Sequence, residues 1–549
     1  MRRKKRIIQV IFFISLFFII NGVADTSIAK SHPSETIISL GSVPEGFSII
    51  PKSLKYSMDI KNITYVAVNK KKENIVRLNN TTSPVYYAVR PGTPLFGPVN
   101  DRHAYIAASG PKGKNVFVVI DGKPDPPFDV VDQFIFSVDE SRYAYRAVKN
   151  KKQCVVVDGK HGPFYDGIPI KESMTFSPDS KHFAYVAFNN NRCFLVLDGK
   201  EQKKYNFIQD VYFSYDSKHI AYKARIEKNG LKEKWCLVYD GIESKIYDGL
   251  FVFINSYDSR HITFVALKER KLLLIQDMKE IAVHDRIGLP VYSPDSKHFA
   301  CAFADGFNWH IKVDNTLGPS FDNVLKFYFS PDSSRYAYTA IDGKEIYCIV
   351  DGIQSEAYKN IKPFKFSLDS KRYAYSAADD EGARIVVDGK PGKIYKAVGE
   401  PYFSPDSKTV VYRAINKNHN KWVTVINGKE QPLSFYAIKD YHFSPDSKRL
   451  AYATMTGKGK TLFVVDGKEQ PLFSILGMPA FSPDGKHIAY HVMTFDEKWH
   501  LVVDGKQLPG TYGGFMRGTP IIFDSNTHFH TIAMREPGPE FLRIEVDIP

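Results

Sequence analysis

Histidine recurs at one position of a motif that is repeated along this chain of 549 residues. An imidazole ring can act as an acid or base near neutral pH and is a common metal ligand. Other copies of the motif carry arginine at this position, and arginine cannot serve as a base near neutral pH and is a poor metal ligand. We therefore expect the position to need a basic group on a turn, in a structural role. The histidines are His182, His219, His261, His298 and His487, and the arginines are Arg142, Arg335, Arg372 and Arg449.

An aspartate stands three residues before each of these basic positions, in the sequence Ser-Pro-Asp-Ser or a variant of it. Such repetition could indicate a ring of carboxylates. Each aspartate belongs to the turn of a different repeat, however, and its side chain can accept hydrogen bonds from nearby backbone amides. We expect this local capping role for Asp139, Asp179, Asp216, Asp295, Asp332, Asp406, Asp446 and Asp484.

Other chemical motifs are incomplete, so the sequence predicts no catalytic residue, no metal site and no cofactor. Gly459-Lys460-Thr461 ends like a phosphate loop, but the pattern requires glycine where Thr454 stands. Three carboxylates from Asp379 to Glu381 lack the spacing of a calcium loop and are predicted to be a solvated loop tip. The five cysteines form no Cys-x-x-Cys pair and are predicted to be small, buried and unpaired.

The elements that position these residues form a repeat. When the copies of the repeat are counted by the position of the turn aspartate, thirteen lie from Asp59 to Asp524, about 39 residues apart. In residues 174–210, MTFS, HFAYVAF, CFLVLD and EQKKYNFIQD are predicted strands separated by turn residues. The Asp-Gly pair after the third strand predicts a two-residue hairpin turn that needs positive φ angles. This turn uses Gly159, Gly199, Gly389 and Gly467, among others.

The second strand of each unit is apolar on both faces, as in FAYVA at residues 183–187. Burial on both faces fits a four-stranded sheet that is packed between two neighbours. Stacked sheets of four strands and forty residues are typical of a β-propeller. The sequence therefore predicts an all-β protein of about thirteen four-stranded propeller blades.

The decapeptide FSPDSKHFAY at residues 176–185, with close copies at 329, 403, 443 and 481, resembles the WD40-like propeller repeat of TolB-type periplasmic proteins. A similar repeat occurs in the propellers of prolyl-oligopeptidase-like peptidases. The resemblance runs from about residue 50 to the end and implies the fold rather than a function. The chain has no Gly-x-Ser-x-Gly sequence, and too few residues precede the first repeat for the α/β domain of TolB.

Thirteen blades exceed the four to eight of most single rings, so we expect two tandem propellers. The first, residues 30–290, would hold about six blades, and the second, residues 291–549, about seven. The boundary is placed near residue 290 because the Asp-Gly turn is lost between Gln276 and Pro290. The last repeat lacks a fourth strand, and the extended segment from Glu35 to Leu40 is predicted to supply it and close a ring.

Residues 1–29 have the layout of a secretory signal peptide: a basic start, an apolar run from Ile7 to Ile20 and cleavage after Ala24 or Ala29. The run is short for a membrane span. We expect a periplasmic or secreted protein with no membrane span in the mature chain. The net charge of +14 falls to about +10 on cleavage and is dispersed, and a nucleic-acid partner is not expected behind an export signal.

Loops between the second and third strands vary from blade to blade and are rich in lysine. Loops on a rigid scaffold often carry recognition, and basic loops suit an anionic surface or polymer, although they can also serve only for solubility. These loops carry Lys70, Lys71, Lys112, Lys114, Lys151, Lys152, Lys228, Lys232, Lys234, Lys268, Arg270, Lys417, Lys421 and Lys458.

Two functions are consistent with these features. The first is an exported, non-catalytic binding or scaffold protein that recognises a protein or an anionic envelope polymer through its variable loops. The second is a propeller enzyme, a polysaccharide lyase or hydrolase, with an active site in a central channel. The second function requires the isolated polar residues to converge there; these are His284, Asp285, Trp309, His310, His442 and His491.

Overall fold

The computed structural model describes residues 32–549 except 100–101, 171–173, 230–231, 417–419, 458, 517 and 537. The predicted signal peptide lies outside the described residues. In the described part, the chain forms antiparallel sheets and one short 3-10 helix, η1 (Pro111–Gly113). No helix among these residues is long and apolar enough to cross a membrane. The prediction of an all-β propeller is confirmed.

The described residues form thirteen sheets, each built mainly from strands that follow one another in the chain. In the fourth sheet the order is β16 (Met174–Phe176), β17 (Phe183–Asn189), β18 (Arg192–Leu197) and β19 (Lys200–Tyr205). The first three bounds agree with the prediction, whereas the predicted fourth strand at 201–210 is too long: β19 ends at Tyr205, and residues 207–210 open β20 (Phe207–Phe213), the first strand of the next blade. We number the sheets as blades 1 to 13 in chain order, beginning at residue 47.

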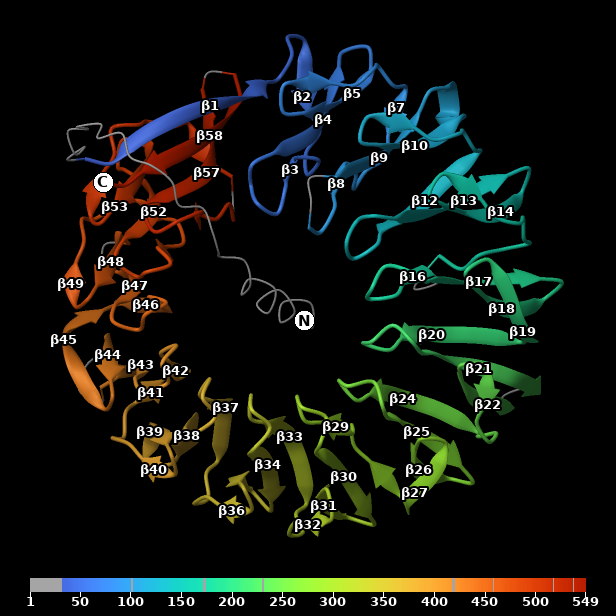
Figure 1. Cartoon of the computed structure of the whole chain (residues 1–549). Helices are drawn as coiled ribbons and strands as arrows, with labels where there is room; N and C mark the ends of the chain where they lie inside the picture. The colour runs from blue at the N-terminus through green and yellow to red at the C-terminus, as the bar shows by residue number, and fades with distance from the viewer. Residues whose placement is uncertain are drawn as a thin grey trace, which may run out of the picture.

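The first strand of each blade lies nearest the centre of the ring and the fourth lies outside (Figure 1). Proline interrupts several first strands because it has no N–H to donate, as at Pro290, Pro401 and Pro479. In six blades the first strand is therefore two short strands. The unbroken first strands besides β16 are β12 (Val130–Phe136), β20 (Phe207–Phe213), β24 (Gly249–Asn255), β33 (Asn323–Phe329), β37 (Asn360–Phe366) and β46 (Ala437–Phe443). The divided ones are β2 (Phe47–Ile49) and β3 (Lys55–Tyr56), β7 (Ala88–Val89) and β8 (Leu95–Phe96), β28 (Arg286–Ile287) and β29 (Val291–Tyr292), β41 (Ala397–Val398) and β42 (Tyr402–Phe403), β50 (Ile475–Leu476) and β51 (Ala480–Phe481), and β55 (Gly514–Phe515) and β56 (Ile522–Phe523).

The second and third strands form the buried middle of each blade, because a β-rich apolar strand packs on both faces there. Besides β17, the second strands are β4 (Ile63–Asn69), β9 (His103–Ala108), β13 (Tyr143–Lys149), β21 (Ile220–Asn229), β25 (Ile262–Lys268), β30 (Phe299–Asp305), β34 (Tyr336–Asp342), β38 (Tyr373–Asp379), β43 (Val410–Ile415), β47 (Leu450–Met455), β52 (Ile488–Met493) and β57 (His528–Arg535). Besides β18, the third strands are β5 (Asn74–Leu78), β10 (Val116–Ile120), β14 (Lys152–Val157), β22 (Lys232–Tyr239), β26 (Lys271–Gln276), β31 (Asn308–Val313), β35 (Glu345–Val350), β39 (Gly382–Val387), β44 (Trp422–Ile426), β48 (Thr461–Val465), β53 (Trp499–Val503) and β58 (Glu540–Asp547).

The fourth strands are short and mostly polar, as expected for the outer edge of a blade. Besides β19, they are β6 (Thr81–Thr82), β11 (Lys123–Pro124), β15 (Lys160–His161), β23 (Ile242–Glu243), β27 (Lys279–His284), β32 (Thr316–Leu317), β36 (Ile353–Gln354), β40 (Lys390–Pro391), β45 (Lys429–Phe435), β49 (Lys468–Glu469) and β54 (Lys506–Gln507). Blade 13 has no fourth strand of its own after β58. It takes β1 (Ser34–Ser42) instead.

Strand β1 closes the ring as predicted. It pairs antiparallel with β58, from Ser34 opposite Asp547 to Ser42 opposite Glu540, so that the two ends of the described chain lie side by side (Figure 1). The Glu35 carboxylate accepts hydrogen bonds from the Gly510 N–H and from the Tyr512 hydroxyl, both at 2.8 Å. With β1 as its outer strand, blade 13 has the four-stranded plan of the other blades.

All thirteen blades form one ring, which corrects the prediction of two tandem rings. Packing is continuous at the predicted boundary, where Val265 and Leu274 of blade 6 share a buried cluster with Cys301 of blade 7. The turn between β26 and β27 also persists without glycine, because Asp277 and Met278 both adopt positive φ. Last and first blades pack in the same way, through a cluster that contains Phe541 and Ile63. Each blade contacts only its neighbours, so the local repeat pattern does not determine how many blades close a ring.

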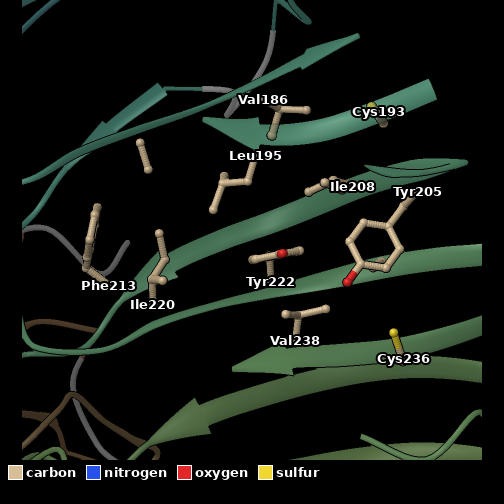
Figure 2. Close-up of a cluster of buried hydrophobic side chains, with 12 residues drawn as sticks. Val186, Cys193, Leu195, Tyr205, Ile208, Phe213, Ile220, Tyr222, Cys236 and Val238 are labelled. Atoms are coloured by element: carbon tan, nitrogen blue, oxygen red, sulfur yellow. The ribbon is translucent and has the colours of Figure 1, made fainter. Parts of the chain in front are cut away.

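Buried side chains from facing blades fill the space between them. Figure 2 shows the cluster between blades 4 and 5, where Leu195 and Val186 face Ile220 and Val238. Cysteines belong to these clusters, and all five are free and buried, as the sequence predicts. Burial raises the pKa of Cys236 to about 12. These thiols therefore act as small apolar groups.

Candidate functional site

The repeated aspartates cap their own turns on the face that carries the first-to-second and third-to-fourth connections, here called the turn face. In blade 4, the Ser177 hydroxyl donates to Asp179 Oδ1 at 2.6 Å, and the Lys181 N–H donates to the same atom at 3.1 Å. Such bonds stabilise the charged carboxylate; those from Ser293 and from a backbone N–H lower the pKa of Asp295 to about 2. The same serine-to-aspartate bond occurs at all the predicted positions, namely Asp139, Asp179, Asp216, Asp295, Asp332, Asp406, Asp446 and Asp484.

The histidines and arginines of the motif pair with the aspartate of the Asp-Gly turn in the same blade. His182 Nδ1 lies 2.7 Å from Asp198 Oδ2, and Arg372 Nε lies 2.9 Å from Asp388 Oδ2. The turn itself is the predicted type, because aspartate and glycine both have positive φ. The predicted glycines Gly159, Gly199, Gly389 and Gly467 have φ angles of 77°, 79°, 77° and 76°. The basic position thus joins the two turns of one blade.

A set of hydrogen bonds between blades has no counterpart in the sequence analysis. The backbone N–H of Asp179 donates to Ser217 Oγ of the next blade at 2.9 Å. The acceptor serine has a positive φ, which is unusual for a residue with a Cβ. Serine at this place in almost every copy of the motif is the signal that would have indicated the bond. The other donor and acceptor residues are Asp139 and Ser180, Asp216 and Ser259, Asp258 and Ser296, Asp295 and Ser333, Asp332 and Ser370, Asp369 and Ser407, and Asp406 and Ser447.

Long basic side chains inside the blades form a second set of contacts that the sequence analysis missed. Arg146 is buried, donates to both oxygens of Asp132 and reaches the Ile168 carbonyl of the next blade at 3.4 Å. Lys223 likewise lies 2.7 Å from Asp210 and donates to the Phe251 carbonyl of the next blade. A basic residue in the middle of an apolar strand, as in YAYRAV, is the sequence signal for this contact. These residues hold adjacent blades in place.

The predicted binding residues lie on the opposite face, here called the loop face, at the connections between second and third strands. Lys152 pairs with Asp166 and Lys234 with Asp248, at 2.6 and 2.7 Å. Lys417 and Lys458 lie outside the described residues, as do the side chains of Lys112, Lys228 and Lys232. The exposed ones are Lys70, Lys71, Lys114, Lys151, Lys152, Lys268, Arg270 and Lys421.

Both faces carry exposed basic groups, but the motif histidines and arginines of the turn face are all compensated, whereas lysines after its Asp-Gly turns, such as Lys160, Lys200 and Lys390, form no ion pair among the described residues. On the turn face, each motif histidine or arginine has a carboxylate within 3 Å. On the loop face, seven of the predicted groups are exposed and form no ion pair within the part of the chain that the structure describes: Lys70, Lys71, Lys151, Lys268 and Arg270 at hairpin tips, together with Lys114 and Lys421. The loop face therefore presents positive charge that the fold itself does not use.

The six residues proposed for a central active site do not come together. They lie at the end of β27 and just after it, in β31, in β46 and in β52, which belong to blades 6, 7, 11 and 12. His284 Nδ1 is 2.8 Å from Asp305, Asp285 pairs with Lys271, and the buried His491 is 2.9 Å from the Thr531 hydroxyl. Burial lowers the pKa of His491 to about 3 and also lowers that of His442. Among the described residues, no group of three or more His, Cys, Asp and Glu side chains could hold a metal ion.

Comparison with models of known protein families gave no match, and no curated protein matches the sequence. Solved structures with a related arrangement include a eukaryotic initiation factor, with 15% identity over 62% of this chain and 96% of that chain and a TM-score of 0.30. TolB from Acinetobacter baumannii shows 14% identity over 47% of this chain and 75% of its own, with a TM-score of 0.21. The β-propeller domain of the trilobed protease from Pyrococcus furiosus shows 13% identity over 49% and 97%, with a TM-score of 0.24. The chain is a thirteen-bladed β-propeller on the evidence of its own sheets and packing.

Proposed function

We propose that this protein is an exported, non-catalytic β-propeller that binds an anionic partner, either an envelope polymer or an acidic protein surface, through its loop face. The observation that carries the proposal is the set of uncompensated basic groups at the loop tips, Lys70, Lys71, Lys151, Lys268 and Arg270. The proposal that the protein is exported rests on the signal-peptide layout of residues 1–29. No curated relative bears on the function.

The geometry supports binding to an extended partner. The loop tips are separated by the blades of a packed ring, so their spacing is set by the fold rather than by the loops. A polymer that reaches several tips gains affinity from each contact, because every contact after the first is intramolecular. Each single lysine contact at an exposed site is weak. Binding should therefore depend on several loops together and fall steeply with salt.

A charge-matched pair of variants tests the proposal. The loop variant replaces the five uncompensated groups at the hairpin tips by glutamine. The control variant replaces five exposed turn-face lysines by glutamine, namely Lys181, Lys218, Lys297, Lys408 and Lys486. Fluorescently labelled poly-γ-glutamate is the probe, and its Kd for the chain from residue 30 is measured by anisotropy at low and moderate salt. We expect the loop variant to lose binding and the control to keep it. Equal loss in both variants would refute the role of the loop face.

The alternative of an enzyme with a site in a central channel has no observation in its favour. Its six candidate residues lie in four different blades, and three of them, His284, Asp285 and His491, have structural partners within their own blade or the next one.

A further inference from the structure

A cavity of about 650 Å³ lies at the outer edge of the ring, where the link from blade 2 meets blade 3, and its wall includes Lys149 and Lys152 of the loop face. Its walls come from Pro126 and Pro127 of the link, from Lys149 and Lys152 at the ends of β13 and β14, and from His161 and Phe164 near the outer edge. Cavities of 300–1,000 Å³ are typical of small-ligand sites. We propose that this cavity binds an acidic sugar unit of a glycan. The inference rests on the proposed function and identifies the class of anionic partner.

The apolar walls suit the flat face of a sugar ring. Phe164 is 38% exposed, and the His161 ring lies 5.5 Å from it. The C–H groups on one face of a pyranose carry partial positive charge, whereas the face of an aromatic ring is negative, so the two pack favourably. Pro126 and Pro127 add rigid apolar surface at the other wall. A flexible acidic peptide would have no need of these walls.

The cationic groups select an acidic unit over a neutral one. In the described part of the chain Lys149 forms no ion pair, and Lys152 is held by Asp166 at 2.6 Å. A lysine ammonium has three donors, so Lys152 can bond Asp166 and a ligand carboxylate together. The carboxylates of the region are already used by the fold: Asp129 accepts from the Asn150 N–H at 2.7 Å, and Asp166 accepts from a backbone N–H of blade 4. The ammonium groups of Lys149 and Lys152 are therefore the donors of the cavity wall that can meet an acidic unit.

Blade 3 departs from the repeat at the residues that form this site. Where it has His161, five other blades have glutamate, which would repel an anion: Glu201, Glu243, Glu280, Glu430 and Glu469. Several of these glutamates are bound by lysine, for example Glu243 by Lys203 at 2.8 Å and Glu430 by Lys393 at 2.7 Å. His161 Nδ1 lies 3.1 Å from the Gly162 carbonyl, which leaves Nε2 for a ligand. Most blades have a buried aromatic residue at the outer edge, which is Tyr165 in blade 3. Only in blade 3 is the residue before it a phenylalanine, Phe164.

Calorimetric titration of the chain from residue 30 tests the assignment with three probes. These are a galacturonate tetramer, its methyl ester, which has the same rings without the charge, and poly-γ-glutamate. The variants are Phe164→Ala and Lys149→Gln. Phe307→Ala is the matched aromatic control, since Phe307 is 88% exposed at the tip of a loop of blade 7 on the loop face. Lys181→Gln on the turn face is the matched charge control and should keep tetramer binding, and melting temperatures establish that each variant is folded.

We expect the galacturonate tetramer to bind wild-type protein and the methyl ester to bind at least about tenfold more weakly, because a charge-assisted contact is lost. Phe164→Ala and Lys149→Gln should each weaken the tetramer about tenfold, while Phe307→Ala does not. Phe164→Ala should leave poly-γ-glutamate binding unchanged.

The outcomes separate this inference from the function on which it rests. The cavity is not a sugar site if Phe164→Ala binds the tetramer as wild-type protein does, or if the ester binds as tightly as the tetramer. The proposed function of the loop face still stands in that case, provided that the five-site loop variant loses binding of poly-γ-glutamate. If Phe164→Ala weakens the binding of poly-γ-glutamate, the cavity binds acidic peptides instead. Failure of every anionic probe to bind would refute both proposals.

Discussion

Removing strand β1 should open the ring at blade 13. A chain that begins at residue 43 lacks the buried Leu40 side chain, which contributes about 2 kcal/mol by burial alone. It also lacks the Glu35 carboxylate, whose two hydrogen bonds contribute about 1.5 kcal/mol each. The loss is therefore about 5 kcal/mol before the backbone ladder to β58 is counted. If unfolding is cooperative over the described chain, the melting temperature falls by about 5 °C.

Hydrogen exchange is the sharper assay for this truncation, because each blade is stabilised mainly by its neighbours. Amides of β57 and β58 should lose protection, whereas those of blades 4 and 5 should keep it. The peptide SETIISLGS, residues 34–42, should restore the protection when it is added to the truncated chain, and a scrambled peptide should not. Unchanged melting and unchanged protection of β58 in the truncated chain would show that β1 does not close the ring.

Three further outcomes are expected. Ser217→Ala should lower the free energy of unfolding by about 1 kcal/mol in denaturant titration, because the Asp179 N–H loses its acceptor between blades; an unchanged midpoint would contradict this link. Acid should destabilise the ring: the pKa of Asp295, about 2 when folded, lies below its unfolded value of about 3.9. The stability it contributes is present above pH 4 and lost as pH falls towards 2, which thermal melts from pH 6 to 2 would detect. Arg146→Ala should lower the free energy of unfolding by about 3–5 kcal/mol, because it leaves the buried Asp132 charge unpaired. Adding Asp132→Ala should recover part of that stability. If the double variant is no more stable than Arg146→Ala, the unpaired charge is not the cause.

Most of the blade could be predicted because its determinants are local. The turn in FSPDSKHFAY depends on hydrogen bonds within five residues, and the Asp-Gly hairpin depends on two φ angles. Strand spans follow from alternating and continuous apolar runs between those turns. Because the last repeat lacks a fourth strand, the sequence also predicted that Glu35 to Leu40 would supply one. The pairing of β1 with β58 confirms this prediction.

The candidate site was predicted less well. The loop-face lysines were found from their variability and charge, but whether a lysine is compensated depends on carboxylates more than ten residues away. Asp166, for example, binds Lys152 across the edge of blade 3. The cavity beside Phe164 joins residues of a link, a loop and an outer edge, and no spacing in the sequence marks that combination.

The sequence by itself determined the repeating unit: four strands, two kinds of turn and a sheet buried on both faces, because these depend on neighbours in the chain. Only the tertiary structure decided that thirteen such units close one ring rather than two. The angle between successive blades is set by side chains that meet across blade faces, such as Leu274 and Cys301, and small differences in that angle add up around the ring. The same packing decides which basic groups find a carboxylate and which remain exposed on the loop face.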